Sequence, residues 1–222
     1  MHQPLPYTIR PMEPGDVPAV AAIERLSFPT PWPPSSYLHE LGHSTRSFYY
    51  TLLKPATGTA VPSRRGWRHW MCGVMGLSKE SRVIGYAGFR LRDAGAHIST
   101  IAVHPDWRGR GLGELLLLTA MEKTLALESS VVTLEVRPSN QVAQHLYRKY
   151  GFRLERVHRD YYRDGEDAWL MAAEVSGNAY WTRLTGLRQA LEARLRFQQR
   201  PALDKTMGIG YNHPQDMAGR QR

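Results

Sequence analysis

Cysteine is the scarcest residue that bears on chemistry: the 222-residue chain has one, Cys72. A single thiol excludes an internal disulfide framework and a cysteine cluster for zinc, and no His, Cys or carboxylate spacing suggests another metal site. We expect Cys72 to pack as a small hydrophobe. No run approaches the roughly 18 apolar residues that span a bilayer. The start, Met1 to Pro6, lacks a basic segment followed by an apolar one, so we expect no signal peptide and a cytoplasmic protein without membrane contact.

Acidic residues are fewer than basic ones, and the formal net charge is +9. The excess lies in two segments. Residues 54–82 carry six Lys or Arg against one Glu, and residues 176–222 carry eight against three acidic residues. The remainder is close to neutral, so these segments are interpreted as additions to a neutral core. They would attract nucleic acid or acidic surfaces, or simply remain solvated.

Hydrophobic periodicity predicts one mixed α/β sheet with helices on both faces. Strands are expected over residues 7–12, 47–53, 82–92, 96–103, 131–136, 152–157 and 167–174. Helices are expected over residues 16–27, 36–41, 111–127 and 140–150, with Asp16 as the first N-cap and Gly151 ending the last. The proline-rich stretch 28–34 is predicted to be a stiff loop, and 54–81 an inserted loop between strands. Residues 1–175 would form the main domain, and 176–222 a basic amphipathic helix followed by a disordered tail.

The most informative segment is an arginine- and glycine-rich loop, Arg108-Gly109-Arg110-Gly111-Leu112-Gly113, between a strand and a helix. Glycines let backbone N–H groups approach an anion, and the helix N-terminus adds donors and partial positive charge. The two arginines would add charge-assisted contacts. The loop therefore predicts a phosphate or pyrophosphate site, with a plain helix start as the alternative.

Two common phosphate motifs do not fit this loop. A dinucleotide fingerprint starting at Gly109 needs glycine at position 114, which is Glu114. A P-loop needs a lysine followed by serine or threonine, which is absent. What remains is the pattern Arg-x-x-Gly-x-Gly, formed by Arg108, Gly111 and Gly113.

This pattern, after a strand ending Thr-Ile-Ala-Val-His-Pro, resembles the acetyl-coenzyme A signature of the GCN5-related N-acetyltransferases (GNAT). Later pieces resemble the RimI branch of ribosomal-protein-alanine N-acetyltransferases. These are Leu-Glu-Val-Arg-Pro-Ser-Asn at 134–140, Leu146-Tyr147, Tyr150-Gly151-Phe152, Asp160-Tyr161-Tyr162 and Gly-Glu-Asp-Ala at 165–168. The resemblance covers about residues 7–175. The chain departs from it at 54–81, where the family has a short hairpin, and after 175, where the family ends; both departures bear on the protein target.

The resemblance implies a GNAT fold with a mixed, mostly antiparallel sheet flanked by helices, followed here by the basic C-terminal helix. It implies acetyl transfer from acetyl-coenzyme A to a protein N-terminal α-amine, with a ribosomal protein as partner. The cofactor-binding residues implied are Ile101, Ala102, Val103, Arg108, Gly109, Arg110, Gly111, Leu112, Gly113, Glu114 and Asn140. The first three would pair with the pantetheine arm like an added strand, and an N–H there would polarise the thioester carbonyl. Asn140 is alternatively, or also, a helix N-cap.

An amine that attacks a thioester must be neutral. An α-amine is about a tenth neutral at pH 7, whereas a lysine is neutral only about once in two thousand, so a modest base suffices for an N-terminal acceptor. Glu135, in the strand after the cofactor helix, matches the family's base; otherwise it is a rim charge or a partner of Arg137. Tyr147 matches the acid that protonates the leaving thiolate, although its place on an apolar stripe also suits a core tyrosine.

Trp32, Tyr161 and Tyr162 are candidate walls of a peptide groove, or residues of simple core and hairpin packing. Two other functions remain open. One is acetylation of a small amine or a protein lysine. The other is a non-catalytic acetyl-coenzyme A-binding module that docks on ribosomes or RNA through its basic segments, which intact Glu135 and Tyr147 disfavour.

Overall fold

The computed structural model describes residues 5–54, 83–93 and 95–198. Seven strands form one sheet in the order β1-β2-β3-β4-β5-β7-β6. They are β1 (Thr8–Pro11), β2 (Ser47–Leu53), β3 (Val83–Arg92), β4 (Gly95–Val103), β5 (Val131–Val136), β6 (Arg153–His158) and β7 (Ala168–Glu174). Neighbouring strands are antiparallel except β4 and β5, which are parallel because α3 forms the crossover between them. The predicted mixed sheet is confirmed.

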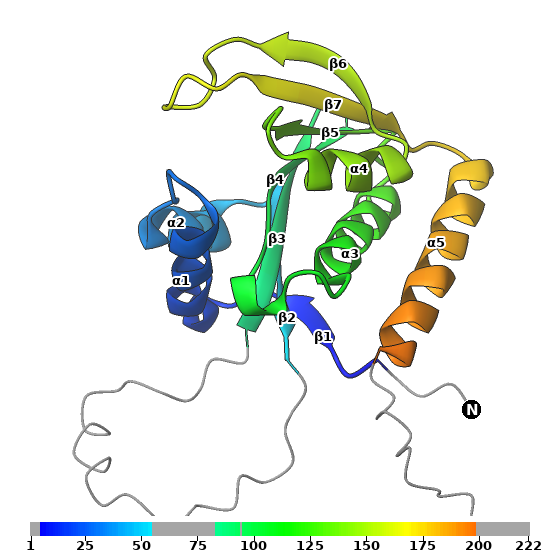
Figure 1. Cartoon of the computed structure of the whole chain (residues 1–222), viewed down its shortest axis with the longest axis horizontal. Helices are drawn as coiled ribbons and strands as arrows, with labels where there is room; N and C mark the ends of the chain where they lie inside the picture. Colours follow the sequence, from blue (N-terminus) through cyan, green and yellow to red (C-terminus); the bar gives the residue numbers. More distant parts are fainter. Residues whose placement is uncertain (1–4, 55–82, 94, 199–222) are drawn as a thin grey trace, which may run out of the picture.

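Helices cover both faces of this sheet, as expected (Figure 1). Helices α1 and α2 lie on one side of β3 and β4, and α3, α4 and α5 lie on the other. The helices are α1 (Val17–Ser27), α2 (Pro34–His43), α3 (Leu112–Ala126), α4 (Gln141–Lys149) and α5 (Asn178–Phe197). Short 3-10 turns precede α1 (Pro14–Asp16) and α3 (Pro105–Trp107).

Two details of the first helices differ from expectation. Asp16 stands at the N-cap position of α1 but gives it no side-chain hydrogen bond. Its carboxylate instead accepts from the backbone N–H of Glu13 at 2.9 Å and from the guanidinium of Arg10 at 2.7 Å. Helix α2 begins at Pro34, inside the expected loop, because proline is well suited to the first helical turn, where its missing N–H has no partner to lose.

Except for Lys54, the predicted insert lies outside the described residues, and so do Cys72 within it and the predicted tail from Arg200. The strands that flank the insert are nevertheless paired, with Leu53 of β2 opposite Val83 of β3. The β2–β3 register shifts just before this pair, between Leu52, which pairs with Gly85, and Leu53, so Ile84 interrupts the regular pairing.

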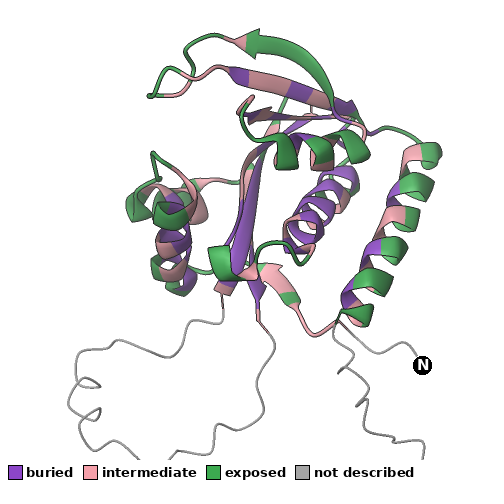
Figure 2. Ribbon diagram, viewed as in Figure 1, coloured by how far each residue is buried: buried purple, intermediate pink, exposed green. Residues whose placement is uncertain are grey.

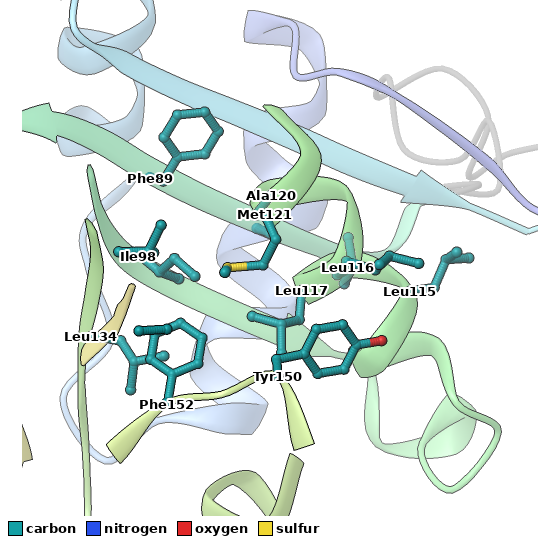
Figure 3. Packing of buried hydrophobic residues seen from close by; sticks show 14 of the residues in the cluster. Phe89, Ile98, Leu115, Leu116, Leu117, Ala120, Met121, Leu134, Tyr150 and Phe152 are labelled. Carbon is teal, nitrogen blue, oxygen red and sulfur yellow. The ribbon is translucent and has the colours of Figure 1, made fainter. Parts of the chain in front are cut away.

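Helix α3 is the centre of the core. It is buried on nearly all sides (Figure 2), as expected for a helix that is apolar all round. Its inner residues Leu117 and Met121 pack with Ile98, Leu134 and Phe152 (Figure 3). Its outer side is covered by α5, whose three core leucines are each 1% exposed: Leu184, Leu191 and Leu195. The expected C-terminal helix is therefore confirmed, and its leucines share one apolar cluster with the sheet and α3.

The parallel strands β4 and β5 separate part-way along their length. Their register covers only Ala96 to Ile98, opposite Val132 to Leu134. At the same level the β3–β4 register shifts: Phe89 pairs with Ile98 and Gly88 with Thr100, which leaves Ser99 as a bulge. A bulge increases local twist and re-aims the strand, so the last five residues of β4 diverge from β5.

Candidate active site

Glu135 lies at the point where β4 and β5 separate. It directly follows Leu134, the last β5 residue paired with β4, and it pairs with Leu170 of β7 on its other side. Alternation along β5 buries Val132, Leu134 and Val136 against the helices and turns Glu135 to the opposite face. Its side chain keeps 19% exposure. A carboxylate at a break between strands, reachable by solvent, is in a position to act on a ligand.

The partner of Glu135 is His97, on β4. His97 Nε2 lies 2.9 Å from Glu135 Oε2. Burial raises the pKa of Glu135, but the hydrogen bond and charge of His97, with charges from Arg92 and His158, outweigh it and leave that pKa below its ordinary value. The carboxylate is therefore ionised at neutral pH. Arg137, the alternative partner considered from the sequence, is engaged elsewhere.

Arg137 holds the β6–β7 loop. Its Nη1 bonds Asp164 Oδ2 at 2.9 Å and Glu166 Oε2 at 2.7 Å, and its guanidinium stacks on the Tyr162 ring, 3.7 Å from the centroid. Tyr161 lies edge-on to Tyr162 and is 52% exposed. Of the two tyrosines, Tyr161 thus presents its ring to solvent, while Tyr162 is fixed beneath Arg137.

Tyr147 is half-buried on α4 and packs against Phe152, with ring centroids 5.8 Å apart. Burial, with a contribution from Tyr162, raises the pKa of Tyr147 to about 12. Burial also raises the pKa of Tyr162 to about 12, and Glu135 is among its further causes. Tyr162 therefore interacts electrostatically with both candidate catalytic residues, and Tyr147 carries its proton at neutral pH.

Trp32, on the loop between α1 and α2, is held from beneath by a buried carboxylate. Glu24, 2% exposed, accepts hydrogen bonds from the hydroxyls of Tyr37 and Tyr86 and from the backbone N–H of Trp32 at 3.3 Å. The Trp32 ring packs on Tyr37 yet stays 37% exposed. Glu24 was not among the predicted site residues, although a carboxylate within the apolar stripe of a predicted helix is a signal that the sequence contains.

The glycine loop has the geometry expected of an anion site. Gly109 and Gly111 have φ of 74° and 80°, a left-handed conformation that favours glycine. Helix bonding starts with Leu115 N–H to Gly111 O at 3.0 Å, so the N–H groups of Leu112, Gly113 and Glu114 have no intrahelical acceptor. A Cβ at Gly109 would meet nothing within 4 Å, and one at Gly113 would meet only Val103 at 4.0 Å. This open space beside free donors fits a pyrophosphate.

The loop arginines also shape the loop itself. Arg108 donates to Val103 O at 3.0 Å and to Ser27 Oγ at 2.9 Å, which ties the loop to β4 and α1. Arg110 donates to Asp106 O at 3.1 Å and lies over the Trp107 ring. Phosphate contacts by these side chains remain a prediction.

Glu114 directs its side chain away from the loop. It is 8% exposed, and its carboxylate accepts from Lys149 Nζ at 2.5 Å, Tyr150 Oη at 3.0 Å and Arg194 Nη2 at 2.5 Å. Its predicted cofactor role therefore falls to its backbone N–H. The side chain of Glu114 thus connects α3 to the end of α4 and to α5.

The arginines of α5 all have partners within the protein. They pair with backbone carbonyl or carboxylate groups as follows: Arg183 with Lys149 O, Arg188 with Glu122, Arg194 with Glu114 and Arg196 with Glu192. This pairing weakens the case that α5 is a nucleic-acid docking surface.

Four further residues were expected to bind the cofactor, three on β4 and one at the start of α4. Ile101, Ala102 and Val103 pair with β3 at Ala87, Tyr86 and Gly85, and they lie beyond the stretch of β4 that pairs with β5. Asn140 is confirmed as an N-cap, since its Oδ1 accepts from Ala143 N–H at 3.1 Å; a cofactor contact remains a prediction.

Two surface grooves accompany these features. One of about 550 Å³ lies beside Trp32. The other, of about 890 Å³, is lined by Thr133 and Leu170, which flank Glu135, and by arginines of α4, β6 and α5. Neither groove is lined by Glu135 or Tyr147. The candidate active site is therefore identified from the contacts of these side chains and not from a cavity around them. Within the described ranges no three metal-ligating side chains gather, and no helix there is long and apolar enough to cross a membrane.

The model of the acetyltransferase (GNAT) family matches residues 18–152. With that match, the fold and the phosphate loop, the chain belongs to the GNAT family and is an acetyl-coenzyme A-dependent N-acetyltransferase.

Relatives of the RimI type are among the proteins that the chain resembles. The chain is 32% identical over 169 residues to a putative ribosomal protein bS18-alanine N-acetyltransferase of Bacillus subtilis, spanning 76% of this chain and 95% of that protein. It is 31% identical over 169 residues to the N-alpha-acetyltransferase RimI of Mycobacterium tuberculosis, spanning 75% and 91%. The crystal structure of the ribosomal-protein-S18-alanine N-acetyltransferase of Escherichia coli superposes with a TM-score of 0.60 at 26% identity, covering 77% and 95%. The predicted resemblance is confirmed.

Proposed function

We propose that this enzyme acetylates the N-terminal α-amine of a protein, with alanine first and a ribosomal protein of the bS18 type as acceptor. The relatives that carry this activity in their names support the acceptor class. The observation that supports the chemistry is the ionised carboxylate of Glu135 at the separation of β4 and β5.

Glu135 acts as general base. It takes a proton, directly or through a water, from the α-ammonium group, whose pKa of about 7.7–8.0 demands only a modest base. The freed nitrogen lone pair forms the C–N bond to the acetyl carbon, and the C–S bond breaks. The nitrogen, cationic after the attack, loses its second proton to water, and water later returns a proton to Tyr147. Tyr147, protonated because burial raises its pKa to about 12, gives its proton to the departing thiolate.

The acceptor would approach between Trp32 and Tyr161. These exposed rings lie on the α1–α2 and β6–β7 segments, which lie on one side of the molecule (Figure 1). The glycine loop and the first turn of α3 would hold the pyrophosphate, and the free edge of β4 the pantetheine arm.

The deciding experiment is acetyl transfer to peptides that differ only in their first residue, with the modified nitrogen located by mass spectrometry. Alanine-first peptides should react at the α-amine. If they stay unmodified while free lysine or polyamines react, the acceptor assignment is wrong.

The catalytic roles are tested by Glu135→Gln and Tyr147→Phe, each of which should lower kcat by about 10²- to 10⁴-fold. Glu128→Gln and Tyr50→Phe are matched controls; Glu128 is exposed and Tyr50 lies on β2. Wild-type turnover in either test variant would refute the corresponding role.

A further inference from the structure

His97 is a buried titratable residue to which the proposed chemistry gives no part. It is 7% exposed on β4, in the short stretch that still pairs with β5. Its Nε2 lies 2.9 Å from Glu135 Oε2 and its Nδ1 lies 3.0 Å from Thr133 Oγ1. Because Thr133 and Glu135 are two residues apart on one strand, their side chains share a face and hold the imidazole between them.

The hydrogen-bonding capacities of these groups fix the arrangement. An ionised carboxylate only accepts, so His97 Nε2 carries a proton and donates it to Glu135. In the neutral imidazole, Nδ1 then accepts from the Thr133 hydroxyl. In the imidazolium, Nδ1 donates to Thr133 Oγ1, and that hydroxyl can turn to Ala96 O, 3.4 Å away. The chain Thr133–His97–Glu135 is therefore satisfied in either charge state.

This chain also determines which carboxylate oxygen is available. Oε2 of Glu135 is occupied by His97, and within the described residues no hydrogen bond is formed by Oε1. The partly exposed side chain can thus present Oε1 to a ligand while Oε2 stays fixed. Pinning one oxygen removes rotational freedom that the base would otherwise lose on binding the acceptor.

We propose that His97, held by Thr133, is a positioning residue for acetyl transfer: it fixes Oε2 of Glu135 so that Oε1 receives the proton of the acceptor α-ammonium. His97 keeps its own Nε2 proton throughout, so one proton moves from nitrogen to Oε1 and none is created or lost. The inference rests on the proposed role of Glu135 as base.

Loss of His97 would also alter the dependence of kcat on pH, at the acidic side where activity falls (the acid limb). The groups that act on Glu135 besides His97 are Arg92 at the end of β3, His158 at the end of β6, and the tyrosines 161 and 162 of the β6–β7 loop. Without His97, burial acts on the carboxylate with less opposition, and its pKa rises. The pH below which activity falls should rise with it.

The test is His97→Phe, which keeps a ring of similar size but removes both nitrogens. We expect kcat on an alanine-first peptide to fall about 10- to 100-fold, since a hydrogen bond to a charged group is lost. KM for acetyl-coenzyme A should not change, and the acid limb should move to higher pH. His43→Phe, on the exposed end of α2, is the matched control and should behave as wild type. A folded His97→Phe protein with wild-type kcat and acid limb would overturn the inference.

Thr133→Val, which is nearly isosteric, provides a second test. It becomes the deciding variant in the event that His97→Phe fails to fold. Removal of the hydroxyl should lower kcat about two- to tenfold and shift the acid limb in the same direction. Unchanged kcat and pH profile in Thr133→Val would count against the inference.

Glu135→Gln separates this inference from the proposed function. If Glu135→Gln keeps full turnover, the base assignment itself is wrong. If Glu135→Gln is inactive and His97→Phe is normal, only the role of His97 is refuted. Adding His97→Phe to Glu135→Gln should cause little further loss, because both act through one carboxylate; a full, independent loss would contradict the coupling.

Discussion

Glu114→Gln should weaken the packing of the C-terminal helix α5 against α3, the helix that follows the glycine loop. Glu114 is 8% exposed. Its carboxylate accepts hydrogen bonds from Lys149 on α4, from Tyr150 at the C-cap of α4, and from Arg194 on α5. The amide keeps the shape of the side chain but leaves two cations without a counter-charge.

The magnitude follows from the exposure of the partners. Removing one partner of a fully buried ion pair costs about 3–5 kcal/mol, whereas an exposed pair contributes about 0–1 kcal/mol. The side chains of Lys149 and Arg194 are 40% and 45% exposed, so the loss should lie between these limits, at about 2 kcal/mol. For a chain of this size that corresponds to a Tm lower by roughly 4–8 °C.

The same loss should depend on pH. Burial raises the pKa of Glu114, but its bonds to Lys149 and Arg194 outweigh this and leave the pKa below its ordinary value. A carboxyl group whose pKa is depressed by folding stabilises the protein above its unfolded pKa, and that stability is lost as pH falls through the folded pKa. The difference between wild type and Glu114→Gln should therefore be full at neutral pH, begin to shrink as pH falls below the unfolded carboxyl pKa of about 4, and vanish only below the lower pKa of folded Glu114.

Thermal unfolding followed by circular dichroism at several pH values measures both effects, with Glu128→Gln as an exposed control. Arg194→Gln alone should lose less than Glu114→Gln, and the double variant less than the sum, because the two residues share one interaction. A wild-type Tm for Glu114→Gln at neutral pH, or a loss that does not change with pH, would refute the reasoning.

Two further substitutions test the cofactor edge. Gly111→Ala should cost roughly 1–2 kcal/mol for its left-handed backbone, and more because its Cβ would lie 3.1 Å from Arg194 Nη2. Gly109→Ala, with similar φ but open space, should show only the backbone effect in unfolding experiments, and it should raise KM for acetyl-coenzyme A because its Cβ enters the space proposed for the pyrophosphate. Asn140→Ala removes the N-cap of α4 and should cost about 1 kcal/mol, and a higher KM for acetyl-coenzyme A than in Ser139→Ala would establish the predicted cofactor contact. Unchanged stability in Asn140→Ala would contradict the cap.

The sequence alone determined the features that depend on near neighbours. The left-handed glycines and the helix start after them, the Asn140 cap and the stop at Gly151 follow from backbone preferences within a few residues. The amphipathic helix α5 could be predicted for the same reason, because its leucines recur at helical spacing. Glu135 was found by motif, and its position one residue past the β4–β5 pairing agrees with a site at the strand separation.

The tertiary structure alone decided which groups meet. His97 reaches Glu135 only because the α3 crossover sets β4 parallel to β5 in one register and the bulge at Ser99 then separates them. Arg137, two residues from Glu135, pairs instead with the β6–β7 loop, and the basic helix α5 directs Arg194 to Glu114. Such pairings depend on strand register and helix packing across long sequence separations, which no local preference encodes. The glycine loop could therefore be predicted from its motif. The pairing of Arg194 with Glu114 on α3, and of His97 with Glu135, could not.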